Sequence, residues 1–289
     1  MPELPEVEIT VRDLKKKVLN RTFIDVWTDA PKLIKKPRNF QSFKKEIINK
    51  KIKEISRRGK NIIFELSRGK ILLIHQKLTG HLLFGKWKRE NNIWVASPGP
   101  LSDKMNSFIH VVFLLDNEKQ LALSDLRKFA KIELWDKDEF LESDEFRNIG
   151  LDPLSPNFSF LNFKKLIKKN REIKKLLMDQ KLIAGIGNIY SSEILFDAMI
   201  HPLKKGMALS DMEIRRLYQS TRKILRKGLE LGGASISDYR RINGERGKFD
   251  KYRKVYRKEG NPCPRCGTPI KKIIVGGRSA YFCPKCQKL

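Results

Sequence analysis

The sequence predicts a multidomain α+β fold, with an N-terminal helix and an antiparallel β-sandwich, then a helical domain, then a zinc finger. Three observations lead to this prediction. Apolar residues follow a helical period in residues 3–19, whereas short apolar stretches between turn residues fill residues 22–135. Helical periodicity returns in residues 160–231, and all four cysteines lie in the last 27 of the 289 residues. We expect domains at residues 1–136, 150–236 and 254–289.

The first helix is predicted from a single apolar stripe. Its apolar residues recur three or four positions apart, which places them on one face of a helix. Pro2 and Pro5 fall in or just before the first turn, where a missing backbone N–H costs no helical hydrogen bond. The stripe consists of Leu4, Val7, Val11, Leu14 and Val18.

The strands are predicted from short apolar runs separated by Gly, Asn and Asp. Runs of about six residues at this spacing are typical of an antiparallel sandwich or barrel. The Pro-rich residues 150–159 then read as a linker, and Gly232-Gly233 as the stop of the last long helix. A basic loop at residues 237–248 leads to the finger. The predicted strands are "NIIFEL", "ILLIHQKL", "FIHVVFLL", "QLALSDL" and "KIELW".

Charge indicates a polyanionic partner. The chain has 61 Lys and Arg against 33 Asp and Glu, a net charge of +28, and nucleic acid is the first candidate. A membrane surface, a ribosome or a merely Lys-rich composition would also account for this charge. No apolar run is long enough to cross a bilayer, and the N-terminus lacks the order of a signal peptide. We therefore expect a cytoplasmic monomer that has no contact with a membrane.

The cysteines form a four-thiolate pattern typical of zinc. Cys263 and Cys266 are separated by two residues, as are Cys283 and Cys286, and 16 residues lie between the pairs. Two disulfides are the alternative, but nothing else in the sequence suggests secretion. We expect one structural Zn²⁺, which would stabilise a segment too small to fold on its own core.

The chain start, MPELPEVE, has an unusual chemistry for so basic a protein. Removal of Met1, which we expect before a small second residue, would leave the secondary amine of Pro2 as the N-terminus. An α-amino group titrates about two pH units below a lysine side chain, so it is the better amine nucleophile at neutral pH. Glu3 and Glu6 lie one turn apart beside that amine and are candidates for proton transfer. The alternative is a well-formed helix start in which Pro sets φ and Glu complements the dipole.

Several motifs together resemble one family. "PELPEVE" at the start, "GIGN" in the helical region and the four-Cys finger occur in the order of the formamidopyrimidine-DNA glycosylase family (Fpg). The resemblance runs from Pro2 to Gln287. It implies a helix–two-turns–helix fold for the helical domain and a β-hairpin for the finger.

The resemblance also implies catalytic residues. Pro2 matches the proline that forms a Schiff base with the sugar of the damaged nucleotide, and Glu3 matches the residue that protonates the opened sugar. Glu6 matches the second carboxylate. Lys60 of "RRGKN" matches a lysine with a proton-transfer role, and Arg278 matches the finger arginine that grips phosphates and assists the second elimination.

Further positions match DNA contacts in the family. The residues that fill the gap left by a flipped base correspond to Leu78, Arg127 and Phe129, where Leu78 replaces a usual Met. The remaining contacts correspond to His75, His110, Lys169, Lys174 and Asn188.

The chain departs from the family pattern close to these wedge residues. Leu126 and Ala130 stand where Pro and Gly are usual, and Lys77 replaces a usual Gly. Ala130 would be costly if its position required a positive φ. We therefore expect the departures to affect loop geometry and opposite-base choice, while the Pro2 chemistry is unaffected.

The resemblance implies a bifunctional glycosylase and abasic-site lyase of base excision repair. Its substrate would be double-stranded DNA with oxidised purines such as 8-oxoguanine and formamidopyrimidines, cleaved by β,δ-elimination. One alternative is an endonuclease VIII (Nei)-like enzyme for oxidised pyrimidines, although Leu4 favours the purine branch. The other is a non-catalytic nucleic-acid-binding homologue, against which the presence of Pro2, Glu3 and Lys60 argues.

Overall fold

The chain packs as two compact units. The computed structural model describes residues 1–236 and 238–289, so Ser237, at the start of the predicted basic loop, lies outside the described residues. This division into two units does not test the three domains expected from the sequence, so their ranges remain predictions. The units are Met1–Arg147 with Leu231–Asp250, and Asn148–Glu230 with Lys251–Leu289.

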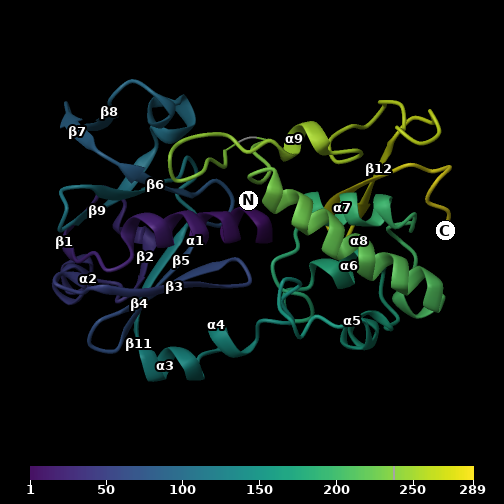
Figure 1. Cartoon of the computed structure of the whole chain (residues 1–289), viewed down its shortest axis with the longest axis horizontal. Coiled ribbons are helices and arrows are strands. Elements are labelled where there is room, and N and C mark those ends of the chain that lie inside the picture. Colours follow the sequence, from purple (N-terminus) through teal and green to yellow (C-terminus); the bar gives the residue numbers. More distant parts are fainter. Residues whose placement is uncertain (237) are drawn as a thin grey trace. The chain divides into compact units, whose positions relative to one another are not determined.

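The first unit is a sandwich of two sheets, in strand orders β1-β9-β10-β6 and β2-β11-β5-β4-β3, with a separate β7-β8 hairpin (Figure 1). All neighbours are antiparallel except β2 and β11, which are parallel. The predicted α+β fold class and sandwich are thus confirmed with one parallel pair added. The elements are α1 (Leu4–Val18), β1 (Phe23–Thr28), β2 (Ile34–Lys36), α2 (Phe40–Ile47), β3 (Ile52–Arg58), β4 (Asn61–Leu66), β5 (Lys70–His75), β6 (His81–Gly85), β7 (Trp87–Glu90), β8 (Ile93–Ala96), β9 (Ile109–Leu115), β10 (Gln120–Ser124), β11 (Lys131–Asp136), α3 (Lys137–Glu142) and α4 (Asp144–Arg147).

The predicted stripe of α1 is buried between the sheets. Val7, Val11, Leu14 and Val18 belong to a core that includes residues of both sheets, and α1 packs against β3 and β4. The helix begins with Pro5 in its first turn, as the sequence predicts. Burial of this stripe fixes the start of the chain at the edge of the sandwich.

The five-stranded sheet is covered on both faces. In β4, Phe64 and its alternate neighbours face the sandwich core, while Ile63 packs on the outer face with Phe140 of α3. Burial of both faces explains why β4 and β5 are almost continuously apolar instead of alternating with polar residues.

Two loops cross between the sheets. Residues 76–80 connect β5 of one sheet to β6 of the other, and residues 125–130 connect β10 back to β11. Since β6 pairs with β10 and β5 pairs with β11, the two crossings are neighbours. They carry the predicted wedge residues.

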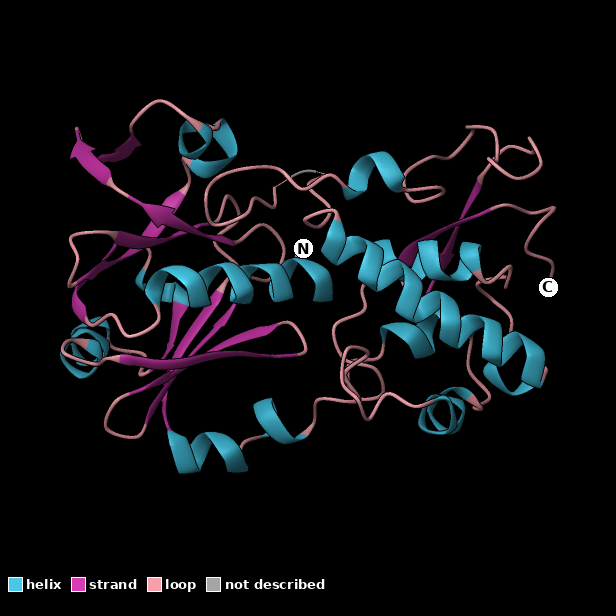
Figure 2. Cartoon of the chain, in the orientation of Figure 1, coloured by secondary structure: helices cyan, strands magenta, loops and turns pink. Residues whose placement is uncertain are grey.

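Helices dominate the second unit, together with the finger hairpin (Figure 2). The first predicted helical stretch is broken at residues 168–172, where the backbone pairs with residues 204–207. A Cβ on Gly206 would lie 1.9 Å from the Ile167 carbonyl oxygen, so this close backbone approach needs glycine. The elements are α5 (Phe160–Ile167), α6 (Ile173–Met178), α7 (Asn188–Asp197), α8 (Asp211–Glu230), β12 (Lys271–Val275) and β13 (Arg278–Phe282), and α9 (Phe249–Tyr252) has residues assigned to each unit.

The predicted helix stop is confirmed. α8 ends at Glu230, and Gly232 and Gly233 follow with φ of 74° and 83°, which is the left-handed region that favours glycine. None of the helices in the described parts of the chain has the length and apolarity that a bilayer crossing demands.

The finger packs on α7. The Glu193 carboxylate, 2% exposed, accepts backbone N–H groups from Lys254, Val255 and Tyr256 at 2.7–3.0 Å. Burial raises the pKa of Glu193 even though these three N–H groups oppose the shift. Phe196 of α7 then joins the small apolar core of the finger. A buried side chain on α7 therefore fixes where the finger begins.

Candidate active site

Residues 2–7, next to the start of the chain, are buried inside the first unit. Pro2 is buried, and Glu3 and Glu6 are 2% and 1% exposed. The two carboxylate oxygens of Glu6 accept the backbone N–H groups of Glu3 and Ala234, each at 2.8 Å. Glu6 thus joins the first turn of α1 to the segment Leu231–Asp250.

Charged groups surround the chain's amino group. Burial lowers the pKa of the Met1 amine, and the positive charge of Lys60 adds to that shift. The carboxylates of Glu3, Glu6 and Asp238 oppose it. The net lowering favours the neutral, nucleophilic form of an amine at this end of the chain.

Lys60 reaches this centre from a tight turn. It follows Gly59, whose φ is 59°, in the two-residue connection between β3 and β4, and it is 7% exposed. Arg57 holds the turn by donating to the Gly59 carbonyl at 2.9 Å and to Glu8 of α1 at 3.0 Å. The structure therefore brings the predicted Glu3, Glu6 and Lys60 together at the amine.

The three predicted wedge residues lie exposed on the two crossing loops. Leu78 is 38% exposed and Phe129 is 50% exposed, which is unusual for large apolar side chains. The Arg127 guanidinium lies 4.7 Å from the centre of the Phe129 ring. The two loops are joined directly, because the Arg127 N–H donates to the Thr79 hydroxyl at 3.1 Å.

The backbone at two of the departures from the family pattern differs from what the sequence predicts for Ala130. Lys77, which replaces a usual Gly, does adopt a positive φ of 52°, and Lys128 has φ 54°. Ala130 is not among the described residues with positive φ, and it is buried at 1% exposure. The cost predicted for a positive φ at Ala130 therefore does not arise.

The two predicted histidines differ in their surroundings. His75 ends β5, and burial together with Lys77, Lys60 and Lys131 lowers its pKa to about 3. Its Nδ1 accepts the Lys77 N–H at 2.9 Å, so the proton of this neutral ring lies on Nε2. His110 Nδ1 lies 2.8 Å from a carboxylate oxygen of Asp29.

The second unit has a basic pocket of about 250 Å³. It is lined by Lys174 and Arg278, which were predicted, and by Arg171 and Lys175, which were not. Lys174 is 1% exposed and donates to the hydroxyls of Ser191 and Ser192 on α7 at 3.0 and 3.2 Å.

Asn188 starts α7 after the glycine-rich loop. The Gln180 side chain orders that loop by accepting from Gly185 N–H and donating to the Ile186 carbonyl, both at 2.8 Å. Among the described residues, Asn188 Oδ1 is a buried atom with no hydrogen-bond partner. Lys169 is exposed in the turn after α5.

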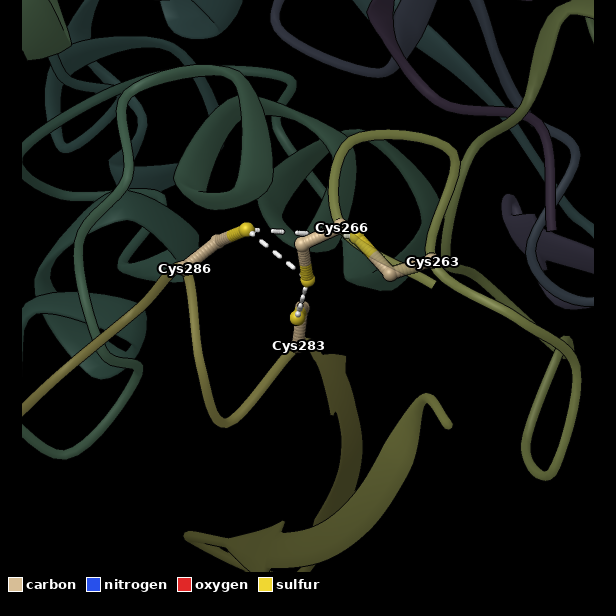
Figure 3. A group of neighbouring side chains, drawn as sticks. All are labelled: Cys263, Cys266, Cys283 and Cys286. Atoms are coloured by element: carbon tan, nitrogen blue, oxygen red, sulfur yellow. Dashed lines mark hydrogen bonds between the residues drawn. The ribbon is translucent and has the colours of Figure 1, made fainter. Parts of the chain in front are cut away.

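The four cysteines converge as the spacing predicts (Figure 3). Their sulfur atoms all lie within 4.8 Å of one another, and none is in a disulfide. Separations of 3.4–4.0 Å between sulfurs bracket the edge of about 3.8 Å expected for a tetrahedron with metal–sulfur bonds of about 2.3 Å. Cys263, Cys266, Cys283 and Cys286 can thus hold a metal ion without further ligands.

Sequence reasoning missed several polar residues at these sites. Asp238 and the Ala234 N–H come from a segment more than 200 positions after the chain start. Arg171 and Lys175 carry no signal beyond positive charge, which is abundant along the chain. Only their common pocket singles them out.

A buried amine among carboxylates, exposed apolar side chains on two joined loops and a four-thiolate finger fit the class of DNA-repair glycosylases. Family models agree. The formamidopyrimidine-DNA glycosylase N-terminal domain matches residues 1–132, the H2TH domain of the same enzymes matches 149–240, and the zinc finger found in FPG and IleRS matches 260–289. The chain belongs to the formamidopyrimidine-DNA glycosylase family.

Individual relatives match over the whole length. The formamidopyrimidine-DNA glycosylase of Pelotomaculum thermopropionicum is 39% identical, with both chains fully covered. Fpg from Lactococcus lactis bound to abasic-site DNA has a TM-score of 0.85 at 34% identity, covering 99% of this chain and 100% of that one. The complex of the same enzyme with DNA containing FAPY-dG also has a TM-score of 0.85, at 35% identity and with the same coverage.

The double acceptor role of Glu6 gives a stability prediction. Glu6→Gln should lower the free energy of unfolding by about 1–3 kcal/mol, because an amide offers one acceptor oxygen where two buried N–H groups need partners. Urea unfolding measures this difference. The control Glu46→Gln, at a half-exposed ion pair with Lys70, should change it by less than about 1 kcal/mol. Equal effects of the two substitutions would contradict the role of Glu6.

Proposed function

We propose that the chain is a bifunctional DNA glycosylase and abasic-site lyase that removes oxidised purines, 8-oxoguanine and formamidopyrimidines among them, from double-stranded DNA. The observation that carries the proposal is the buried amino group at the chain start, flanked by Glu3, Glu6 and Lys60. Such an environment has little use in a protein that only binds nucleic acid, because burying charged groups costs free energy.

In the proposed reaction the amine of Pro2, exposed by removal of Met1, attacks the anomeric carbon of the damaged nucleotide. The new N–C bond forms as the glycosidic bond breaks, and the departing base takes up a proton. The bound amine loses its own proton, and the C1′–O4′ bond of the sugar opens with O4′ leaving as a hydroxyl, which yields an iminium. This iminium withdraws electrons from the sugar, so the neighbouring C–H loses its proton and the 3′-phosphate leaves. A second elimination releases the 5′-phosphate. Burial assists the first step by keeping the amine neutral.

The surrounding side chains have distinct proposed roles. Glu3, held at the start of α1, protonates the sugar oxygen as the ring opens. Glu6 fixes the backbone of Glu3 through its hydrogen bond. Lys60 lies near the same amine and transfers protons in the elimination steps. Arg278, in the basic pocket of the second unit, binds phosphate and assists the second elimination.

DNA contacts are proposed at the remaining predicted positions. Lys174 in the basic pocket, exposed Lys169, and Asn188 at the start of α7 bind phosphates. His75 donates from its protonated Nε2, and His110, whose Nδ1 faces Asp29, is the second histidine proposed to contact DNA.

Base extrusion is assigned to the exposed wedge. A glycosylase must take its target out of the stack and fill the gap that remains. Leu78 and Phe129 supply apolar surface for that gap, and Arg127 supplies donors for the unpaired base.

Zinc is the proposed metal of the finger. Four thiolates suit Zn²⁺, and because all ligands come from the protein no position is open for substrate. Its role is to hold the β12–β13 hairpin, and with it Arg278, in a fixed conformation.

The nucleophile can be located by borohydride trapping on abasic DNA followed by mass spectrometry. We expect the linkage at Pro2, and no adduct from protein that retains Met1. The trapping rate should rise with pH as the amine loses its proton, and level off below about pH 8 because burial lowers the amine pKa. The control Pro5→Ala should still link at Pro2. Linkage at a lysine would overturn the proposal.

Lesion choice separates this proposal from an enzyme for oxidised pyrimidines. Duplexes with 8-oxoguanine opposite cytosine should be cut at least about tenfold faster than duplexes with thymine glycol, a difference of about 1.4 kcal/mol in the barrier. Single-turnover rates measure it. Faster cutting of thymine glycol would favour an enzyme for oxidised pyrimidines. No cutting of either duplex would favour a protein that binds nucleic acid without catalysis.

Metal removal tests the finger. A strong chelator should expose residues near the finger to protease and weaken DNA binding, since the finger has only a small apolar core. Metal analysis should find one zinc per chain and less in Cys263→Ser. The control Lys285→Ala, an exposed residue between two of the cysteines, should keep its zinc. Full zinc content in Cys263→Ser would contradict the assigned ligands.

A further inference from the structure

A buried carboxylate lies at the start of the second crossing loop, which carries Arg127 and Phe129. Asp125 is fully buried, directly after β10, where the second crossing loop begins. One of its oxygens accepts the backbone N–H groups of Phe129 and Ala130, each at 2.8 Å. Its other oxygen accepts from Arg127 N–H at 3.3 Å and from the Thr79 hydroxyl. Asp125 therefore gathers donors from both crossing loops.

Thr79 completes the connection between the loops. Its hydroxyl donates to Asp125 and accepts from Arg127 N–H at 3.1 Å. The residue after it, Gly80, lies so close to the other loop that an added Cβ would be 3.3 Å from Ala130 Cβ and 2.5 Å from the Gln76 carbonyl oxygen. The two loops are therefore packed against each other, and Asp125 is the buried carboxylate that contacts both of them.

The loops need such a connection because their backbones are strained. Lys77 precedes Leu78, and Lys128 lies between Arg127 and Phe129; both have positive φ. For a residue with a side chain this conformation is unfavourable and persists only where surrounding contacts impose it. Asp125 supplies those contacts in the second loop and, through Thr79, reaches the first.

We propose that Asp125 is a positioning residue for base extrusion: through Thr79 and the backbone of residues 127–130 it holds Leu78, Arg127 and Phe129 in the geometry that enters the DNA stack. The proposal rests on the proposed function of the wedge. Asp125 contacts neither the amine nor Glu3, so its effect falls on opening the stack and not on the bond-breaking steps.

The test compares a substrate that needs extrusion with one that does not. Asp125→Asn keeps the shape of the side chain but replaces an acceptor oxygen with a donor amide facing N–H groups. Single-turnover excision of 8-oxoguanine from a duplex should fall at least about tenfold, because small misplacements of positioning groups cost up to about a hundredfold. Cleavage of an abasic site in single-stranded DNA, where no stack is opened, should stay within about threefold.

A second pair of variants covers the case in which Asp125→Asn fails to fold. Thr79→Val removes the hydroxyl while keeping the volume, and Thr79→Ser retains the hydroxyl. Of these two variants, Thr79→Val should lower the ratio of duplex excision to single-strand cleavage, and Thr79→Ser should not. Asp116→Asn, at an exposed carboxylate that accepts the Thr22 N–H, is the matched control and should leave the ratio unchanged. Thermal melting confirms that each variant is folded.

The outcomes are distinct. A lower ratio in folded Asp125→Asn supports the positioning role, whereas equal losses on both substrates overturn it. Where Asp125→Asn does not fold, a lower ratio in Thr79→Val than in Thr79→Ser supports the role, and equal ratios in these two variants overturn it. Failure of the unsubstituted protein on both substrates would instead overturn the proposed function itself.

Discussion

The buried carboxylate of Glu6 is the interaction on which the candidate centre depends. An ionised side chain at 1% exposure must be paired, and here its two oxygens take the N–H groups of Glu3 and Ala234. One of these groups belongs to Glu3, the residue that caps the start of α1. The other comes from the returning segment, where Gly233 allows an approach that a Cβ, at 2.9 Å from Glu6, would block. The chain start and this segment therefore form one structure.

The centre and the rest of the protein use charge in different ways. Over the whole chain, Lys and Arg exceed Asp and Glu by 28, which favours any polyanion and weakens with salt. At the amine the balance is reversed, because Glu3, Glu6 and Asp238 surround it and Lys60 is the basic neighbour. Buried charges are screened much less than exposed ones. The attraction for polyanions and the ionisation of the buried amine can therefore vary independently.

Buried polar side chains hold several of the candidate functional segments in place. Glu193 fixes the start of the finger, and Asp125 fixes the wedge loops. Lys174 is held against α7 by two serine hydroxyls. Each of these side chains pairs with backbone or hydroxyl groups from a distant part of the sequence. Rigid placement follows, since an alternative arrangement would leave a buried polar group unsatisfied.

The sequence by itself determined the features that depend on neighbouring residues. The stripe of α1, the apolar strands, the stop at Gly232 and the cysteine spacing were all predicted, because periodicity and spacing are local properties. Only the tertiary structure decided that Glu6 meets Ala234, that Asp125 joins the wedge loops, and that Lys77 instead of Ala130 adopts a positive φ. These contacts join distant segments. The sequence alone does not show which partner each of the 33 Asp and Glu residues will contact in the folded chain.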